Sequence, residues 1–235
     1  MSRTYLLATA GLLTLLASPA VAGEAMLGVY AHDISDRISF GGMEHGQQIV
    51  GGFRTTSLDE LPLLFKPRLH FIVGVNTRGG TDYAAAGLSW RFNFAGDRFY
   101  FEPGIGAAIH TGKVNLPSPY DPGLTAAEQA HRLHNWQTKL DLGSRVLFEP
   151  EWSLGWKATD RLSLELSWIH MSHAQLAGGQ EPGLGDFGVR AVYRYGADRV
   201  ISHRHDSVFP WGTVVINVVG SFVLGLTTGL ASHHG

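Results

Sequence analysis

Residues 99–110 read FYFEPGIGAAIH, and side chains of two kinds alternate along this stretch. One row is apolar and consists of Phe99, Phe101, Ile105, Ala107 and Ile109, while the other consists of Tyr100, Glu102, Gly104, Gly106 and His110. Strict alternation of this kind is typical of a β-strand with one apolar face. Residues 84–92 and 151–157 repeat the pattern, so we expect the chain to form a sheet.

Segments of this kind recur between residues 25 and 196. We expect eight strands, at 25–33, 46–55, 67–77, 81–93, 98–110, 143–157, 161–172 and 185–196. Eight is an even number and the smallest usual size of an outer-membrane β-barrel, in which the apolar row faces lipid and the polar row faces the lumen. We therefore predict an all-β fold, an eight-stranded antiparallel barrel with its interior filled by side chains. Residues 125–133 (TAAEQAHRL) are the one helix-like insertion and belong in a surface loop.

The composition agrees with a membrane barrel. Charged residues make up 16% of the chain, against about 25% in a typical soluble domain, while aromatic residues reach 11% and there are 30 glycines. The absence of cysteine excludes a disulfide framework and a thiolate metal site. A formal net charge of -2 gives no reason to expect a nucleic-acid partner.

The first residues predict export. A single arginine precedes the apolar run 6–16, and Ala20-Val21-Ala22 fits the small-x-small rule for signal peptidase. The apolar run is shorter than the ~20 residues that a retained transmembrane anchor needs. We expect a signal peptide at residues 1–22, a barrel at 23–196 and delivery to the outer membrane of a Gram-negative bacterium.

The last part of the chain has another character. A polar linker at residues 197–208 precedes residues 209–230, which read FPWGTVVINVVGSFVLGLTTGL and carry no charge. This segment is long enough to span a bilayer as a C-terminal apolar α-helix. Gly225 and Gly229 stand in the GxxxG spacing that lets helices approach closely.

The strand at 161–172 raises a chemical question. Its apolar row Leu164, Leu166, Trp168 continues into His170 and Ser172. A histidine within reach of a serine can accept the hydroxyl proton and make the oxygen a nucleophile. A nucleophile on the lipid-facing row can meet only a substrate within the membrane, so a lipid ester is the expected target. The alternative is that the strand has left the membrane by Ile169 and that both residues belong to a turn.

Residues 169–195 (IHMSHAQLAGGQEPGLGDFGVRAVYRY) resemble the end of the lipid A 3-O-deacylase family. Residues 98–112 and 142–168 are similar to earlier strands of the same family. The resemblance covers about residues 25–195. It implies a small outer-membrane barrel that hydrolyses an acyl ester of lipid A, the membrane part of lipopolysaccharide. We expect no cofactor and no metal.

By this resemblance, Ser172 is the nucleophile and His170 the general base. The asparagine of the family motif is replaced by His173, so support of the oxyanion falls to His173 and to backbone N–H groups near Ala174. The acidic position of the family falls at about Gly185. The resemblance leaves Asp186, which would need a β-bulge to reach the correct face, or Glu181 as the acid that orients His170.

The apolar tail resembles a different family. About residues 194–230 are similar to the second transmembrane helix of the CrcB-type fluoride channels, and the matching positions are Gly212, Thr213, Asn217, Gly220, Ser221 and Phe222. These channels are dimers of four-helix subunits, so a homodimer is a further expectation. One helix cannot enclose an ion path whose polar groups must be shielded from lipid, and we expect no fluoride conduction by this chain alone. A fused or truncated reading frame is the alternative origin of this tail.

Three functions thus remain open in the sequence. The first is a lipid A deacylase with a Ser-His-acid mechanism, the second a structural barrel without catalysis, and the third a channel-related membrane protein represented by a fragment. The remaining histidines do not predict a metal site, because His203, His205, His233 and His234 lack an i, i+4 pairing with a nearby acid.

Overall fold

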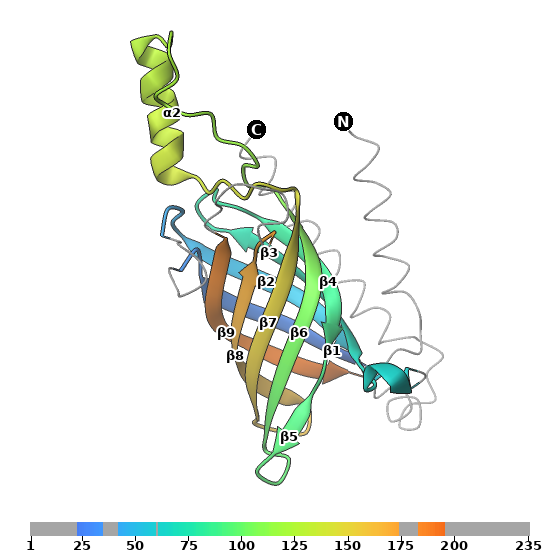
Figure 1. Ribbon diagram of the computed structural model, residues 1–235. Coiled ribbons are helices and arrows are strands. Elements are labelled where there is room, and N and C mark those ends of the chain that lie inside the picture. Colours follow the sequence, from blue (N-terminus) through green and yellow to red (C-terminus); the bar gives the residue numbers. More distant parts are fainter. Residues whose placement is uncertain (1–22, 35–41, 60, 174–182, 196–235) are drawn as a thin grey trace, which may run out of the picture. The chain divides into compact units, whose positions relative to one another are not determined.

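A computed structural model describes residues 23–34, 42–59, 61–173 and 183–195. Residues 23–194 form one compact unit, an antiparallel barrel (Figure 1). The strands are β1 (Gly23–Ala31), β2 (Gln47–Thr55), β3 (Arg68–Asn76), β4 (Tyr83–Ser89), β5 (Phe92–Phe94), β6 (Phe99–His110), β7 (Val146–Lys157), β8 (Leu162–Met171) and β9 (Leu184–Tyr195). The predicted all-β class is confirmed.

The sheet closes into a barrel because strands near its two edges pair with each other. The strands lie in the order β4-β3-β2-β1-β9-β8-β7-β6-β5, and β4 also pairs with β6. The predicted fourth strand, at 81–93, is divided in two, because β4 and the short β5 pair with different stretches of β6. Counted as one strand of the wall, they give the predicted eight-stranded barrel, which the β4–β6 pairing closes.

Alternation assigns each side chain to one face of the wall. In β6, Ile105 is 52% exposed and Ile109 is 58% exposed, whereas Tyr100 and Glu102 are fully buried. The same alternation between exposed and buried positions continues through β7 and β8. Apolar residues of the outward row therefore form the lipid-facing surface, as the sequence predicts.

The two ends of the barrel differ in the length of their connections. One end, called the loop end, carries the β6–β7 connection at residues 111–145 and α2 (Ala126–Thr138). The side chain of Thr125 accepts a hydrogen bond from Glu128 N while Glu128 accepts one from Thr125 N, which is a capping box that starts the helix. The predicted helix is thus confirmed, and it continues beyond the expected 125–133. Long loops are extracellular in outer-membrane barrels, so the loop end faces the cell surface.

The opposite end is called the turn end. It carries the β7–β8 connection at residues 158–161 and the β2–β3 connection, which contains the short 3-10 helix η1 (Pro62–Leu64). Neither η1 nor α2 is long and apolar enough to cross a bilayer. The predicted signal peptide, the polar linker and the apolar helix at 209–230 lie outside the described residues and stay predictions.

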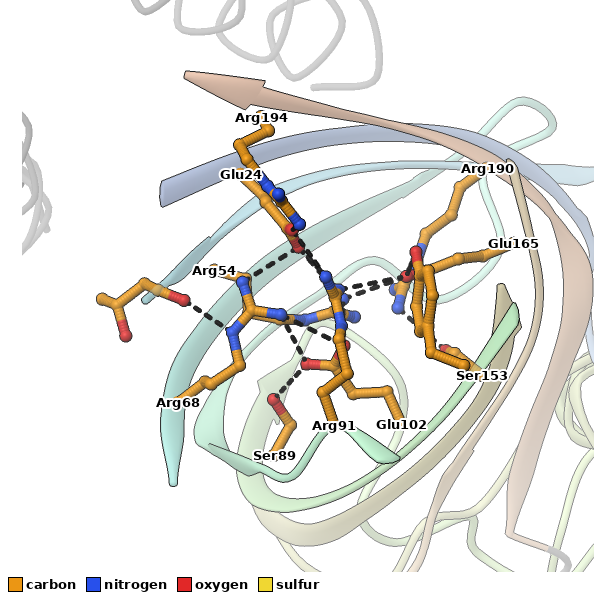
Figure 2. A network of polar contacts seen from close by, with 12 residues as sticks. Glu24, Arg54, Arg68, Ser89, Arg91, Glu102, Ser153, Glu165, Arg190 and Arg194 are labelled. Carbon is orange, nitrogen blue, oxygen red and sulfur yellow. Dashed lines mark hydrogen bonds and ion pairs between the residues drawn. The ribbon is translucent and has the colours of Figure 1, made fainter. Parts of the chain in front are cut away.

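An ionic network fills the lumen (Figure 2). It joins four carboxylates to four guanidinium groups, those of Glu24, Glu102, Glu151, Glu165, Arg54, Arg68, Arg91 and Arg190. Arg54 lies 3.1 Å from Glu102 and 3.0 Å from Glu165, while Arg91 places two nitrogens 2.7 Å from the two oxygens of Glu24. Burial of a charge is costly unless it is paired, and here equal numbers of opposite charges are paired.

The network predicts the effect of removing one cation. Arg190 contacts Glu151 and Glu165 and its side chain is fully buried, so Arg190→Met leaves both carboxylates without one of their partners. We expect the free energy of unfolding to fall by about 3–5 kcal/mol, measured by urea unfolding in lipid vesicles.

Arg194→Met on the same strand is the matched control. Its side chain is 53% exposed and lies 3.5 Å from Glu24, so we expect a loss below about 1 kcal/mol. Equal losses in the two variants would contradict a stabilising role of the buried network.

Candidate active site

The outward row of β8 ends in aromatic rings that contact one another. Trp152 of β7 and Trp168 of β8 face each other across the strands, with ring centroids 5.2 Å apart. The imidazole of His170 stacks on Trp168 at 5.5 Å with an angle of 13° between the ring planes. His170 is only 4% exposed. The imidazole is therefore held at the loop end of the lipid-facing surface by aromatic contacts.

Ser172 continues this row one step beyond β8. Its backbone N donates to Phe148 O at 3.1 Å, and Phe148 N donates to Ser172 O at 2.8 Å. Residues that face each other in an antiparallel pair lie on the same side of the sheet. Because Phe148 is 45% exposed on the outward row, Ser172 lies on that side as well, together with His170.

Two glycines lie beside His170. Gly185 of β9 is its partner in the register. Gly183 has a positive φ of 67°, and a Cβ atom at this position would lie 2.9 Å from Cε1 and 3.4 Å from Nε2 of His170. The chain that enters β9 therefore passes directly against the edge of the imidazole.

Asp186 is not brought to His170. The β8–β9 register runs unbroken from Leu162↔Tyr193 to Met171↔Leu184, so Asp186 faces Ile169 and points to the lumen. The bulge required for the predicted role is absent from these paired residues. The prediction that Asp186 orients His170 does not fit this geometry, because one place along a strand changes the face.

Asp186 instead holds the segment that follows β1. Its Oδ1 lies 3.0 Å from His32 Nδ1 and accepts a hydrogen bond from Asp33 N at 3.2 Å, while Oδ2 accepts one from the Tyr83 hydroxyl at 3.0 Å. Ile34 N donates to Gly185 O at 2.8 Å. This Asp186 clamp ties β1, β4 and β9 together on the lumenal side of the wall that carries His170.

A second carboxylate completes the clamp. Glu44 Oε2 lies 3.2 Å from His32 Nε2 and accepts a hydrogen bond from Thr81 N at 2.5 Å. Burial lowers the pKa of His32, but hydrogen bonds and charge from Asp186 and Glu44 more than offset this and raise it to about 9. Burial likewise opposes ionisation of Glu44, yet the bonds to His32 and Thr81 hold its pKa below the ordinary value. The two carboxyl groups therefore favour the protonated form of His32.

The other predicted site residues are placed as follows. His173 is buried and lies against Gly143, where a Cβ atom would come within 2.5 Å of its Nε2. Ala174 and Glu181 lie outside the described residues, as do the channel-like positions Gly212, Thr213, Asn217, Gly220, Ser221 and Phe222.

A further buried cluster has the composition of a metal site. His70, Glu149 and Glu151 place one nitrogen and two carboxylate oxygens within 4.8 Å of one another. However, Oε1 of Glu151 already accepts hydrogen bonds from Arg54 and Arg190. Two guanidinium groups at this distance repel a metal cation, and we assign no metal to the cluster.

An antiparallel barrel with an apolar exterior and long surface loops defines an outer-membrane β-barrel, and the His-x-Ser pair His170 and Ser172 lies on its outward row. A sequence profile described as "Lipid A 3-O-deacylase (PagL)" matches residues 66–194, more than half of the chain. The chain belongs to this family, and it is an outer-membrane β-barrel of a Gram-negative bacterium.

Several solved structures are similar. The crystal structure of the outer membrane enzyme PagL has 17% identity and a TM-score of 0.49, covering 72% of this chain and 98% of that one. Neisserial surface protein A has 9% identity and a TM-score of 0.42, covering 76% and 98%. The N-terminal barrel domain of Pseudomonas aeruginosa OprF has 11% identity and a TM-score of 0.41, covering 74% and 99%.

Two curated relatives match a short segment of the chain. Fluoride-specific ion channel FluC 1 of Streptomyces avermitilis is 61% identical over 44 residues, which are 19% of this chain and 36% of that protein. FluC 1 of Frankia casuarinae is 54% identical over 41 residues, 17% and 32%. The chain spans about a third of the length of these relatives. The predicted likeness to both families is thus confirmed.

The sequence did not predict the partners of the lumenal residues. His32, Glu44 and Tyr83 come from three distant segments and meet only when the barrel closes. The sequence held one signal for the position of Asp186. Asp186 and Arg190 are an even number of residues apart, so strict alternation along β9 places both side chains on the lumenal face.

The raised pKa of His32 predicts how stability depends on pH. Below about pH 6.5 the residue is protonated in both states and its contribution is complete. The contribution declines as the pH rises and is lost above about pH 9, where folded His32 also loses its proton. We expect the wild type to exceed His32→Gln by up to about 3 kcal/mol near pH 6, and by little at pH 10, in urea unfolding in vesicles.

His45→Gln is the control, because His45 is exposed. A wild-type advantage over His32→Gln that stays constant between pH 6 and pH 10 would contradict a protonated His32.

Proposed function

We propose that the protein is an outer-membrane serine esterase that hydrolyses an acyl ester of lipid A. Its family supports the reaction class. The single observation that carries the assignment to residues is the outward row of β8, in which Trp168 is followed by His170 and Ser172 at the loop end. A serine on the lipid-facing row is accessible from the membrane, and lipid A lies in the leaflet at this end.

The chemistry follows from a serine beside a histidine. The Ser172 hydroxyl oxygen attacks the ester carbonyl carbon while His170 accepts the hydroxyl proton. His170 then donates this proton to the departing sugar oxygen, and the acyl group remains on Ser172. Water activated by the same imidazole releases the fatty acid. Backbone N–H groups near Ala174 are the proposed donors to the oxyanion.

The surrounding side chains suit an acyl substrate. Phe148 lies opposite Ser172, and Trp152 and Trp168 follow on the outward row. A fatty acyl chain lying along these residues stays in apolar surroundings on both sides. The hydrolysed bond would then lie at the boundary between hydrocarbon and head groups.

Glu181 is the proposed orienting acid. Asp186 is engaged on the lumenal side by His32 and Tyr83, which leaves Glu181 of the two predicted acids. Gly183 lies against Nε2 and Cε1 of His170 and is two residues after Glu181. Of the two predicted acids, Glu181 is thus the one that is not engaged in the lumen and that is close in sequence to a residue beside the imidazole.

The other predicted functions have narrower support. A structural barrel without catalysis fits the fold equally well but gives no reason for the stacked His170. The likeness to fluoride channels spans about a third of those proteins, and we do not propose conduction by this chain alone. The homodimer stays a prediction.

Ser172→Ala tests the nucleophile. We expect hydrolysis of lipid A in outer membranes to fall by about 10⁴-fold or more, since catalysis through the acyl-enzyme is lost. Mass spectrometry of extracted lipid A measures the remaining acyl chains. Ser167→Ala is the matched control, because Ser167 lies on the same strand but faces the lumen, 3.2 Å from Ser153. Identical lipid A profiles from cells with the wild type and with Ser172→Ala would refute the enzyme.

Glu181→Gln and Asp186→Asn separate the two acids. We expect Glu181→Gln to lower kcat by about 10²- to 10⁴-fold with unchanged stability, as for loss of an orienting acid. Asp186→Asn weakens the Asp186 clamp and is expected to lower the urea midpoint, with a smaller effect on kcat. The reverse assignment, with kcat lost only in Asp186→Asn, would overturn the choice of Glu181.

A further inference from the structure

The β2–β3 connection at the turn end exposes an unusual amount of apolar surface. Leu63 is 92% exposed and Phe65 is 86% exposed, and two further leucines of the same stretch, Leu61 and Leu64, are also exposed. Residues 61–65 are called the apolar loop. Contiguous apolar patches of this kind mark interaction sites, because contact with water is unfavourable for them.

The apolar loop is attached to the outside of the barrel wall. The indole nitrogen of Trp90 donates a hydrogen bond to Leu64 O at 2.8 Å. Trp90 follows β4, and alternation places it on the outward row, since Ser89 is buried in the lumen and Phe92 is 58% exposed. Figure 1 shows η1 beside the strands at the turn end. The apolar loop is therefore continuous with the lipid-facing surface.

The local backbone keeps the apolar side chains outward. Phe65 and Lys66 both have positive φ angles, of 57° and 53°, which are unusual for residues with a side chain. Lys66 N donates to Leu61 O at 3.1 Å, and Lys66 Nζ lies 3.1 Å from Asp59 Oδ1. These contacts close the turn, and the side chains of Leu63 and Phe65 remain exposed on it.

We propose that the apolar loop inserts into the periplasmic leaflet of the outer membrane, with phospholipid acyl chains as its partner. Tryptophan is typical of the boundary between hydrocarbon and head groups, which is where the Trp90 indole holds Leu64. This anchor is independent of the catalytic proposal and lies at the opposite end of the barrel.

Site-directed spin labelling tests the insertion, because the chain contains no cysteine and single labels are specific. Leu63→Cys and Phe65→Cys are labelled with a nitroxide in the full chain, folded in vesicles of phosphatidylethanolamine and phosphatidylglycerol. Ile105→Cys on the outward row is the lipid-exposed control. Ala158→Cys in the β7–β8 connection is the water-exposed control at the same end.

We expect labels at 63 and 65 to be more accessible to oxygen than to a water-soluble nickel chelate, as at 105, and the label at 158 to show the reverse. Nickel accessibility at 63 and 65 equal to that at 158 would overturn the proposal. Spin–spin broadening at 63 and 65 that disappears on dilution with unlabelled protein would also overturn it, because a second copy would then cover the apolar loop.

Discussion

The closed hydrogen-bonded ladder of the barrel is the constraint on which the other features depend. Successive residues of each strand in such a ladder point alternately to lipid and to the lumen, so the position of a residue along its strand decides which of the two its side chain faces. The β8–β9 register is continuous over ten residue pairs, so no bulge changes the assignment. His170 and Ser172 therefore lie on the lipid side, and Asp186, which faces Ile169, lies in the lumen. The proposed substrate, a membrane lipid, follows from this geometry.

The lumenal face of the barrel wall stabilises the fold, and the outer face carries the proposed active site. The lumen contains the paired charges around Arg54 and Arg190, together with the Asp186 clamp, and these contacts hold the strands in place. The outer face carries the aromatic row that ends in His170. A rigid wall whose lumenal charges are paired can hold the proposed reactive pair on its outer face, because catalytic geometry depends on the residues that support the catalytic side chains.

Period-two alternation predicted the strands within a few residues and the two faces, because both follow from the local side-chain pattern. The helix near Thr125 was predicted separately, from the helix-like sequence of residues 125–133. It also predicted the outward position of His170 and Ser172. The acid was predicted less well, since Asp186 required a bulge that a single sequence does not reveal. The contacts of His32 with Glu44 and Asp186 depend on closure of the barrel and could not be derived from local sequence.

Covalent labelling of Ser172 tests the central claim most directly, namely that the reactive pair faces the membrane. A fluorophosphonate loses fluoride when a serine oxygen bonds to its phosphorus, and only an activated serine reacts readily. In vesicles containing the folded protein, a reagent with a long alkyl chain should modify Ser172, detected by mass spectrometry of peptides, and do so faster than a short water-soluble analogue. An unmodified Ser172, or equal rates with the two reagents, would contradict a nucleophile that meets its substrate in the lipid.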